Sequence, residues 1–178
     1  MTEVRRIVVV DENDRSKVIA DRKIPDVRTD PARPGFCYAD VWFTDRTPVR
    51  LNGMREPPHR PPMLLPPPGG SVCRVVTFPP DATFARKVGT REVENFFAAL
   101  GALRASTWSA GAPHPYMQKT PTLDFCLVLA GEITLVLDTT EVHLAAGDTV
   151  VQRGTNHAWS NRSDRPCVIA FSSHDAER

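Results

Sequence analysis

The second half of the chain is a succession of short apolar stretches separated by polar turns. This pattern predicts strands near residues 104–110, 123–130, 132–138, 141–144, 148–153 and 166–172. Glycine, aspartate and threonine mark the expected turns at 131–132, 138–141 and 146–148. Many short strands with such turns are typical of a β-sandwich or a small barrel.

The first half of the chain carries fewer strand signals. A β-branched run, a polar turn at 11–14 and a second apolar run predict a hairpin over residues 5–20. The run I-V-V-V does not alternate, so we expect this strand to be covered on both faces, with a partner subunit as one candidate cover. Prolines and a glycine predict a loop over 25–36, and further strands are expected at 38–44 and 71–79.

One helix is expected, over residues 90–101. Apolar side chains recur there at positions i, i+3, i+4 and i+7, which makes one apolar face; they are Val93, Phe96, Phe97 and Leu100. Thr90 is the expected N-cap, and Gly101 is a fitting end. A helix that packs on a sheet explains this pattern better than a helix that binds a partner.

Residues 48–70 are dense in proline and end in two glycines. Proline lacks an N–H and fixes φ, so neither a helix nor a central strand can form there. The segment is either a disordered linker or an extended arm that crosses the surface. Met63, Leu64 and Leu65 favour the arm.

Composition narrows the classes of function. The chain has 178 residues, of which 41% are hydrophobic, and a net charge of +1. We therefore expect no nucleic-acid partner and, since no apolar run approaches ~20 residues, no membrane partner. The N-terminal apolar run is too short for a signal peptide, so a cytoplasmic location is expected. The four cysteines form no C-x-x-C pair, which disfavours a zinc site built from two local cysteine pairs and predicts reduced thiols.

The stretch from His114 to Asn161 resembles the two motifs of the cupin superfamily. In the first motif of that family a carboxylate lies seven residues before a glycine, as Asp124 does before Gly131 in D-F-C-L-V-L-A-G-E. In the second motif a glycine precedes a histidine by three residues, and an asparagine follows four residues later. Gly154, His157 and Asn161 occupy these places.

The resemblance implies an all-β fold: a double-stranded β-helix, the cupin jelly-roll barrel, with an N-terminal hairpin, a proline-rich arm and one short packing helix. On this basis we expect the hairpin and arm, 1–70, to pack on a barrel formed by 71–178. Cupins often pair through their sheets, so we also expect a homodimer.

The usual metal ligands of the family are depleted in this chain. Its histidine pair would fall at Tyr116 and Gln118, and aspartate replaces the usual glutamate at 124. Gln152 stands where proline is usual. Only His157 keeps the typical residue of the four ligand positions.

The alternation of side chains along a strand supports the candidate site independently of the family resemblance. Residues of one parity share a face of a strand. If the first motif stays extended, one face carries His114, Tyr116, Gln118, Asp124, Cys126 and Val128. On a further strand, His157, Trp159 and Asn161 also share a parity. Polar groups inside an apolar barrel must be paired, bind a ligand, or be costly to bury.

Two interpretations of these polar groups stay open. A divalent metal (Fe, Mn, Ni or Zn) would use Gln118, Asp124 and His157, with His114 or Tyr116 as a fourth contact. Alternatively there is no metal, and Asp124 forms a hydrogen bond with His157 or Gln118 while a small molecule occupies the lumen. In that case His157 and Asp124 are the catalytic candidates, and Tyr116, Trp159 and Cys126 would contact the substrate.

The resemblance and these residues together predict a small-molecule-binding protein. Our first hypothesis is an enzyme of the lyase or isomerase type, which transfers protons on a small organic acid or a polyketide-like substrate by isomerisation, dehydration or decarboxylation. A metal-dependent dioxygenase is the alternative within enzymes. A ligand-binding cupin without catalysis is the alternative from another class. The fold itself does not choose among them.

Overall fold

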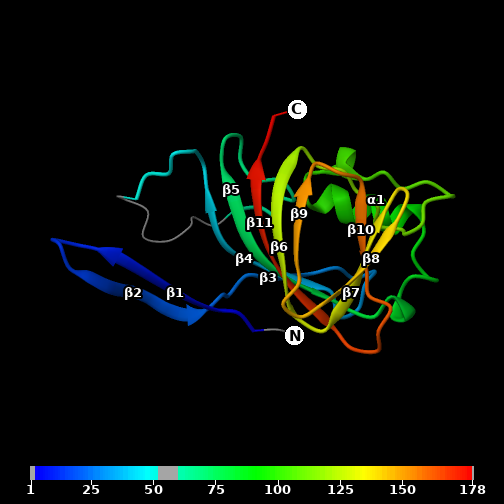
Figure 1. Cartoon of the computed structure of the whole chain (residues 1–178), viewed down its shortest axis with the longest axis horizontal. Helices are drawn as coiled ribbons and strands as arrows, with labels where there is room; N and C mark the ends of the chain where they lie inside the picture. Colours follow the sequence, from blue (N-terminus) through cyan, green and yellow to red (C-terminus); the bar gives the residue numbers. More distant parts are fainter. Residues whose placement is uncertain (1–2, 52–59, 178) are drawn as a thin grey trace.

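The computed structural model describes residues 3–51 and 60–177. Two antiparallel sheets form a jelly-roll barrel, as the sequence predicted (Figure 1). The larger sheet has the order β3-β4-β5-β11-β6-β9 and the smaller has the order β10-β7-β8. Their strands are β3 (Val27–Thr29), β4 (Cys37–Thr44), β5 (Ser71–Phe78), β6 (Thr122–Ala130), β7 (Glu132–Leu137), β8 (Glu141–Ala145), β9 (Thr149–Arg153), β10 (His157–Ser160) and β11 (Cys167–Asp175).

The main core lies between the two sheets. Cys126, Val128 and Ile169 of the larger sheet pack in one cluster with Leu135 and Trp159 of the smaller sheet. Burial alternates along β6, where Asp124, Cys126 and Val128 are buried, whereas residues between them face outward. The predicted parity of these three residues is confirmed.

The helix α1 (Thr90–Ala99) closes a second layer beside the barrel, and its apolar face is as predicted. Gly101 follows the helix end with φ of +61°. The predicted cap is wrong, because Thr90 is the first helical residue and Gly89 is the N-cap. Glu92 accepts a hydrogen bond from the Gly89 N–H at 2.9 Å instead. At ten residues, α1 has half of the ~20 that a membrane span needs, and the described residues contain no helix that could cross a membrane.

Two of the segment predictions are also wrong. Residues 103–105 form a 3-10 turn, η2 (Leu103–Ala105), and 104–110 forms no strand, although an isolated bridge between Ser106 and Gln118 and two backbone hydrogen bonds join it to residues 117–119. The expected loop at 25–36 contains β3, a short edge strand that pairs with β4. A further 3-10 turn, η1 (Asp81–Thr83), follows β5.

The N-terminal hairpin and the arm have different relations to the barrel. The hairpin consists of β1 (Arg5–Asp11) and β2 (Ser16–Lys23), as predicted, and extends away from the barrel (Figure 1). Residues 60–70 cross the barrel as an ordered arm, in which the Leu64 N–H donates to the Leu100 carbonyl at 3.0 Å. The remainder of the proline-rich prediction, residues 52–59, lies outside the described residues. The four cysteines are free, as expected.

Candidate functional site

A cavity of about 100 Å³ opens inside the barrel, beneath α1 and the arm. One part of its wall is aromatic and apolar, and includes Phe36, Phe78, Phe96, Trp159 and Phe171. The other part is polar, and includes Gln118, Thr120, Thr122, Asp124, Gln152, His157 and Ser173. The volume is on the scale of the ~150 Å³ apolar cavity that admits benzene in another protein, so the site suits a small molecule.

Strand register brings the polar wall together. Asp124 on β6 lies beside Gln152 on β9 and beside Ser173 on β11. His157 on β10 pairs through its backbone with Gln118, which sits outside any strand. The two cupin-like motifs therefore meet at one end of the cavity, where an imidazole, a carboxylate and two amides gather.

His157 is buried and presents one ring nitrogen as an acceptor. Its Nδ1 lies 3.0 Å from the Thr155 carbonyl oxygen. A carbonyl oxygen can only accept, so Nδ1 carries the proton and Nε2 keeps its lone pair. Nε2 lies 3.4 Å from the Gln118 amide nitrogen, which can donate to it. Burial lowers the pKa of His157, while the Thr155 carbonyl and the Asp124 carboxylate act in the opposite sense.

Asp124 is a buried carboxylate held by a chain of hydroxyls. Thr122 donates to Asp124 Oδ2 at 2.8 Å, and the hydroxyls of Thr120 and Thr122 lie 2.7 Å apart. This chain holds one oxygen of the carboxylate in the cavity wall, which His157 also lines. Direct hydrogen bonding between Asp124 and His157 is absent from the bonds of the described residues, so their interaction is electrostatic.

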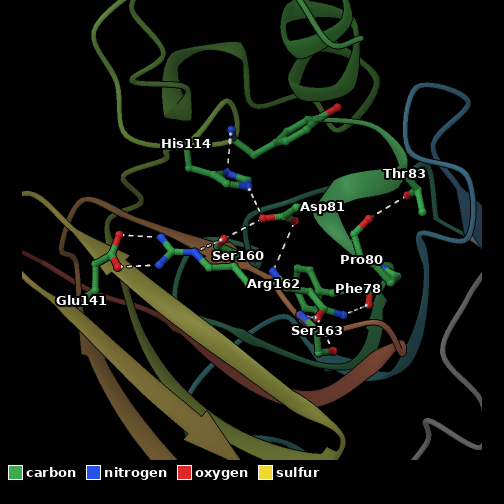
Figure 2. A network of polar contacts seen from close by, with 11 residues as sticks. Phe78, Pro80, Asp81, Thr83, His114, Glu141, Ser160, Arg162 and Ser163 are labelled. Atoms are coloured by element: carbon green, nitrogen blue, oxygen red, sulfur yellow. Dashed lines mark hydrogen bonds and ion pairs between the residues drawn. The ribbon is translucent and has the colours of Figure 1, made fainter. Parts of the chain in front are cut away.

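His114 does not join this site. Its Nδ1 accepts the backbone N–H of Tyr116 at 3.1 Å, and its Nε2 faces Asp81 Oδ2 at 3.5 Å. Figure 2 shows the ring pointing at Asp81, which also accepts a hydrogen bond from Ser160 Oγ at 2.6 Å. The prediction of His114 as a metal contact is therefore corrected, because its ring ties η1 to the segment before Tyr116. The chain turns at Pro115 and loses the extended parity that the prediction assumed.

The three predicted substrate contacts line the cavity. Trp159 packs on Phe78 and Phe171. Burial raises the pKa of the Cys126 thiol far above its ordinary value, so the group stays a neutral filler. Burial likewise raises the pKa of Tyr116, whose hydroxyl donates to Asp30 Oδ2 at 3.3 Å.

Asn161 lies at the turn after β10 and is fully buried. Its amide donates to the carbonyls of Phe78 and Arg165 at 2.9 and 2.7 Å, and its Oδ1 accepts from Ser163. The residue closes this turn and does not line the cavity.

Arg33 is the main cavity residue that sequence reasoning missed. It lies in the proline-rich segment before β4, pairs with Asp30 at 2.8 Å, and is buried. Its guanidinium stacks on three rings at 3.7 to 4.2 Å, those of Phe36, Phe96 and Tyr116. In the sequence, Asp30 and Arg33 are two charged residues among prolines, and nothing in this pattern indicates a cavity. Only the packing of three distant segments reveals it.

Several buried donors on the cavity-lining residues lack a hydrogen-bond partner within the described part of the chain. They are Arg33 Nη2, Tyr38 Oη, Gln152 Nε2 and Trp159 Nε1. Unpaired buried donors are costly. A ligand rich in acceptor oxygens would match this surplus.

The donor set does not fit a metal ion. Within residues 3–51 and 60–177, no three histidine, cysteine, aspartate or glutamate side chains lie close enough together to hold one. Of the four predicted ligands, His114 points elsewhere, the Gln118 amide nitrogen faces the free nitrogen of His157, and Thr122 occupies one oxygen of Asp124. One imidazole and one carboxylate remain.

Known proteins resemble this chain in parts. Residues 106–173 match the family model Cupin_2, described as "Cupin domain". Phomopsin biosynthesis cluster protein D of Diaporthe leptostromiformis is 56% identical over 48 residues, which is 26% of this chain and 25% of that protein. The cupin-domain-containing oxidoreductase virC of Hypocrea virens is 27% identical over 126 residues, which is 68% of this chain and 48% of that protein.

The chain thus spans less than half the length of these two curated relatives. Among solved structures, the cupin domain of Schizosaccharomyces pombe Cnp3 aligns with a TM-score of 0.45 and 10% identity, over 98% of this chain and 88% of that one.

Proposed function

We propose, from the premise that residues 106–173 match the cupin-domain model, that the barrel cavity binds a small, oxygen-bearing organic molecule and catalyses proton transfer on it. One observation carries the proposal: His157 lines the cavity in the tautomer that leaves Nε2 unprotonated, and the only group near this lone pair in the described residues is the Gln118 amide at 3.4 Å, a weak contact that a substrate C–H can replace. A neutral imidazole in that state is a general base.

The chemistry needs only groups that this chain supplies. His157 Nε2 takes the proton from a carbon next to a substrate carbonyl. The C–H electron pair forms a carbon–carbon double bond, and the π pair of the carbonyl moves onto its oxygen, which gives an enolate. Buried N–H and O–H donors of the cavity wall stabilise the resulting negative oxygen. The imidazolium then returns the proton at another position of the substrate, which amounts to an isomerisation.

Asp124 supports the charged state of this cycle. Its carboxylate favours the imidazolium of His157 electrostatically and so strengthens the base. Gln118 holds the ring from the other side. The apolar wall around Phe78 and Trp159 excludes water, which keeps these interactions strong.

The test is deuterium exchange in D2O, followed by proton NMR, on a panel of small 2-oxo acids and 1,3-dicarbonyl compounds. We expect the protein to accelerate C–H exchange for at least one compound, and His157→Gln to lower that rate by about 10²–10⁴-fold. His143→Gln is the matched control, since His143 is exposed on β8. Exchange that persists in His157→Gln would refute the proposal, and binding without exchange would identify a non-catalytic cupin instead.

The dioxygenase alternative requires a metal that the donor set does not fit. Elemental analysis of protein purified without a histidine tag checks this independently. A stoichiometric transition metal that is lost in His157→Gln would overturn our interpretation of the donor set.

A further inference from the structure

A second cavity, of about 260 Å³, lies where the hairpin base, β4 and the arm meet. Five arginines from separate segments line it: Arg6, Arg22, Arg28, Arg60 and Arg74. Arg74 and Leu65 also line the barrel cavity, so the two cavities share a wall. Apart from these two shared residues, no residue of the second cavity takes part in the proton transfer proposed for the barrel cavity.

The second cavity concentrates positive charge. Its described lining holds five arginines against two aspartates, Asp26 and Asp40, an excess of three charges, whereas the whole chain has a net charge of +1. Asp40 pairs with Arg74 at 3.1 Å. Grouped guanidinium charges at a partly closed site repel one another unless an anion joins them.

Arg6 of the hairpin is a buried member of the group with incomplete hydrogen bonding. It is only 9% exposed, and its Nε lacks a hydrogen-bond partner among the described residues. The hydrogen bond that its side chain makes within the described residues runs from Nη1 to the Val41 carbonyl at 3.3 Å. A buried guanidinium with an unused N–H is expensive unless something accepts that hydrogen bond.

Aromatic side chains form the floor of the cavity. The Arg60 guanidinium lies 4.1 Å from the centre of the Phe43 ring, and that of Arg6 lies 6.0 Å from Trp42. Arg28 of β3 donates to the Arg60 carbonyl at 2.9 Å, which links the edge of the larger sheet to the arm. Stacking fixes the plane of a guanidinium and leaves its N–H edge for an oxyanion.

We propose that this second cavity binds a small organic anion. Carboxylate or phosphate oxygens of the ligand sit in the forks of Arg6 and Arg28, and its apolar body lies on Trp42 and Phe43. Guanidinium forks match both oxyanions in bidentate geometry. The site is independent of the proton transfer proposed for the barrel.

Calorimetry at low salt with phthalate, phenyl phosphate and inorganic phosphate tests the proposal. We expect at least one of the two aromatic probes to bind more tightly than inorganic phosphate, because only they cover the aromatic floor. A preference for phenyl phosphate would assign a phosphate ester, and a preference for phthalate would assign a carboxylate. Failure of all three probes to bind below about 10 mM would overturn the proposal.

Variants decide whether the named residues do the binding. Arg6→Gln and Arg28→Gln should each weaken the binding of the better probe at least tenfold. If Arg6→Gln disturbs the hairpin, Arg28→Gln by itself decides the test. Arg5→Gln is the matched control, because Arg5 pairs with Asp21 on the exposed side of β1. An equal loss with Arg5→Gln would indicate non-specific charge and refute the site. His157→Gln should leave this binding unchanged, so the two proposals fail separately.

Discussion

At the scale of single residues, the proposed proton transfer depends on the protonation of His157. Its Nδ1 proton is committed to the Thr155 carbonyl, and burial lowers its pKa below the ordinary value. Between the folded-state pKa and ~6.5, the unfolded chain therefore binds a proton at this ring that the folded protein does not. The free energy of unfolding must fall as the pH drops through that window.

We predict that His157→Gln reduces this acid sensitivity. Melting temperatures measured at pH 7.5 and pH 5.5 should differ less in the variant than in the parent protein, because glutamine does not titrate. His143→Gln, at an exposed site, should keep the parental difference. An unchanged pH dependence in His157→Gln would show that the ring does not titrate abnormally.

At the scale of elements, the tight turn at Gly131 joins β6, which carries Asp124 of the first motif, to β7 in the other sheet. Gly131 has φ of +78°, and a Cβ there would lie 2.7 Å from the Pro166 carbonyl oxygen. Gly101, after α1, has φ of +61° but nothing within 4 Å of such a Cβ. Gly131 is needed both for its positive φ and because a side chain would clash, whereas Gly101 is needed only for its positive φ.

We expect Gly101→Ala to lower the melting temperature by about 2–4 °C, the equivalent of ~1 kcal/mol of backbone strain. Gly131→Ala should lower it at least twice as much, since backbone atoms of β11 must also move. Thermal unfolding followed by circular dichroism compares the two. Equal losses of melting temperature in the two variants would mean that β11 moves away from the new side chain at no energetic cost.

Element types were predictable where a pattern is local. Alternation and turn residues located the strands from residue 122 onward, and the spacing of Val93, Phe96, Phe97 and Leu100 located α1. The prediction of a strand at 104–110 was wrong because that segment pairs irregularly with 117–119. Its conformation is set by these contacts and not by its local pattern. His114 was misplaced for a related reason, since its partner Asp81 lies in another segment.

The site was half predictable. Motif spacing identified Asp124 and His157, and parity explained why Asp124 and Cys126 face inward. Arg33 could not be found this way, because its three aromatic neighbours come from different elements. The second cavity likewise depends on the arm passing over β4.

At the scale of the whole molecule, apolar surface remains open on two parts of the described chain. The outer face of β6 and β9 exposes Phe125, Leu127, Leu129 and Val151, and the hairpin exposes Ile7, Val9 and Val18. A two-stranded hairpin that extends away from its barrel is only marginally stable alone. Both features favour the homodimer expected from the sequence.

Light scattering after size exclusion tests this expectation. We predict twice the monomer mass for the parent protein and the monomer mass for Phe125→Asp/Val151→Asp, a pair that lies side by side on β6 and β9. Leu103→Asp, which alters an exposed leucine on η2, should remain dimeric. A monomeric parent protein would contradict the prediction.

The most direct test of the central claim is the protonation of the His157 ring itself. Side-chain ¹⁵N NMR at pH 7 should show Nδ1 protonated and Nε2 unprotonated, with titration below the ordinary histidine range, and a bound ligand should shift the Nε2 resonance most. A ring protonated at Nε2, or charged at pH 7, would contradict the account, because the cavity would then face no base.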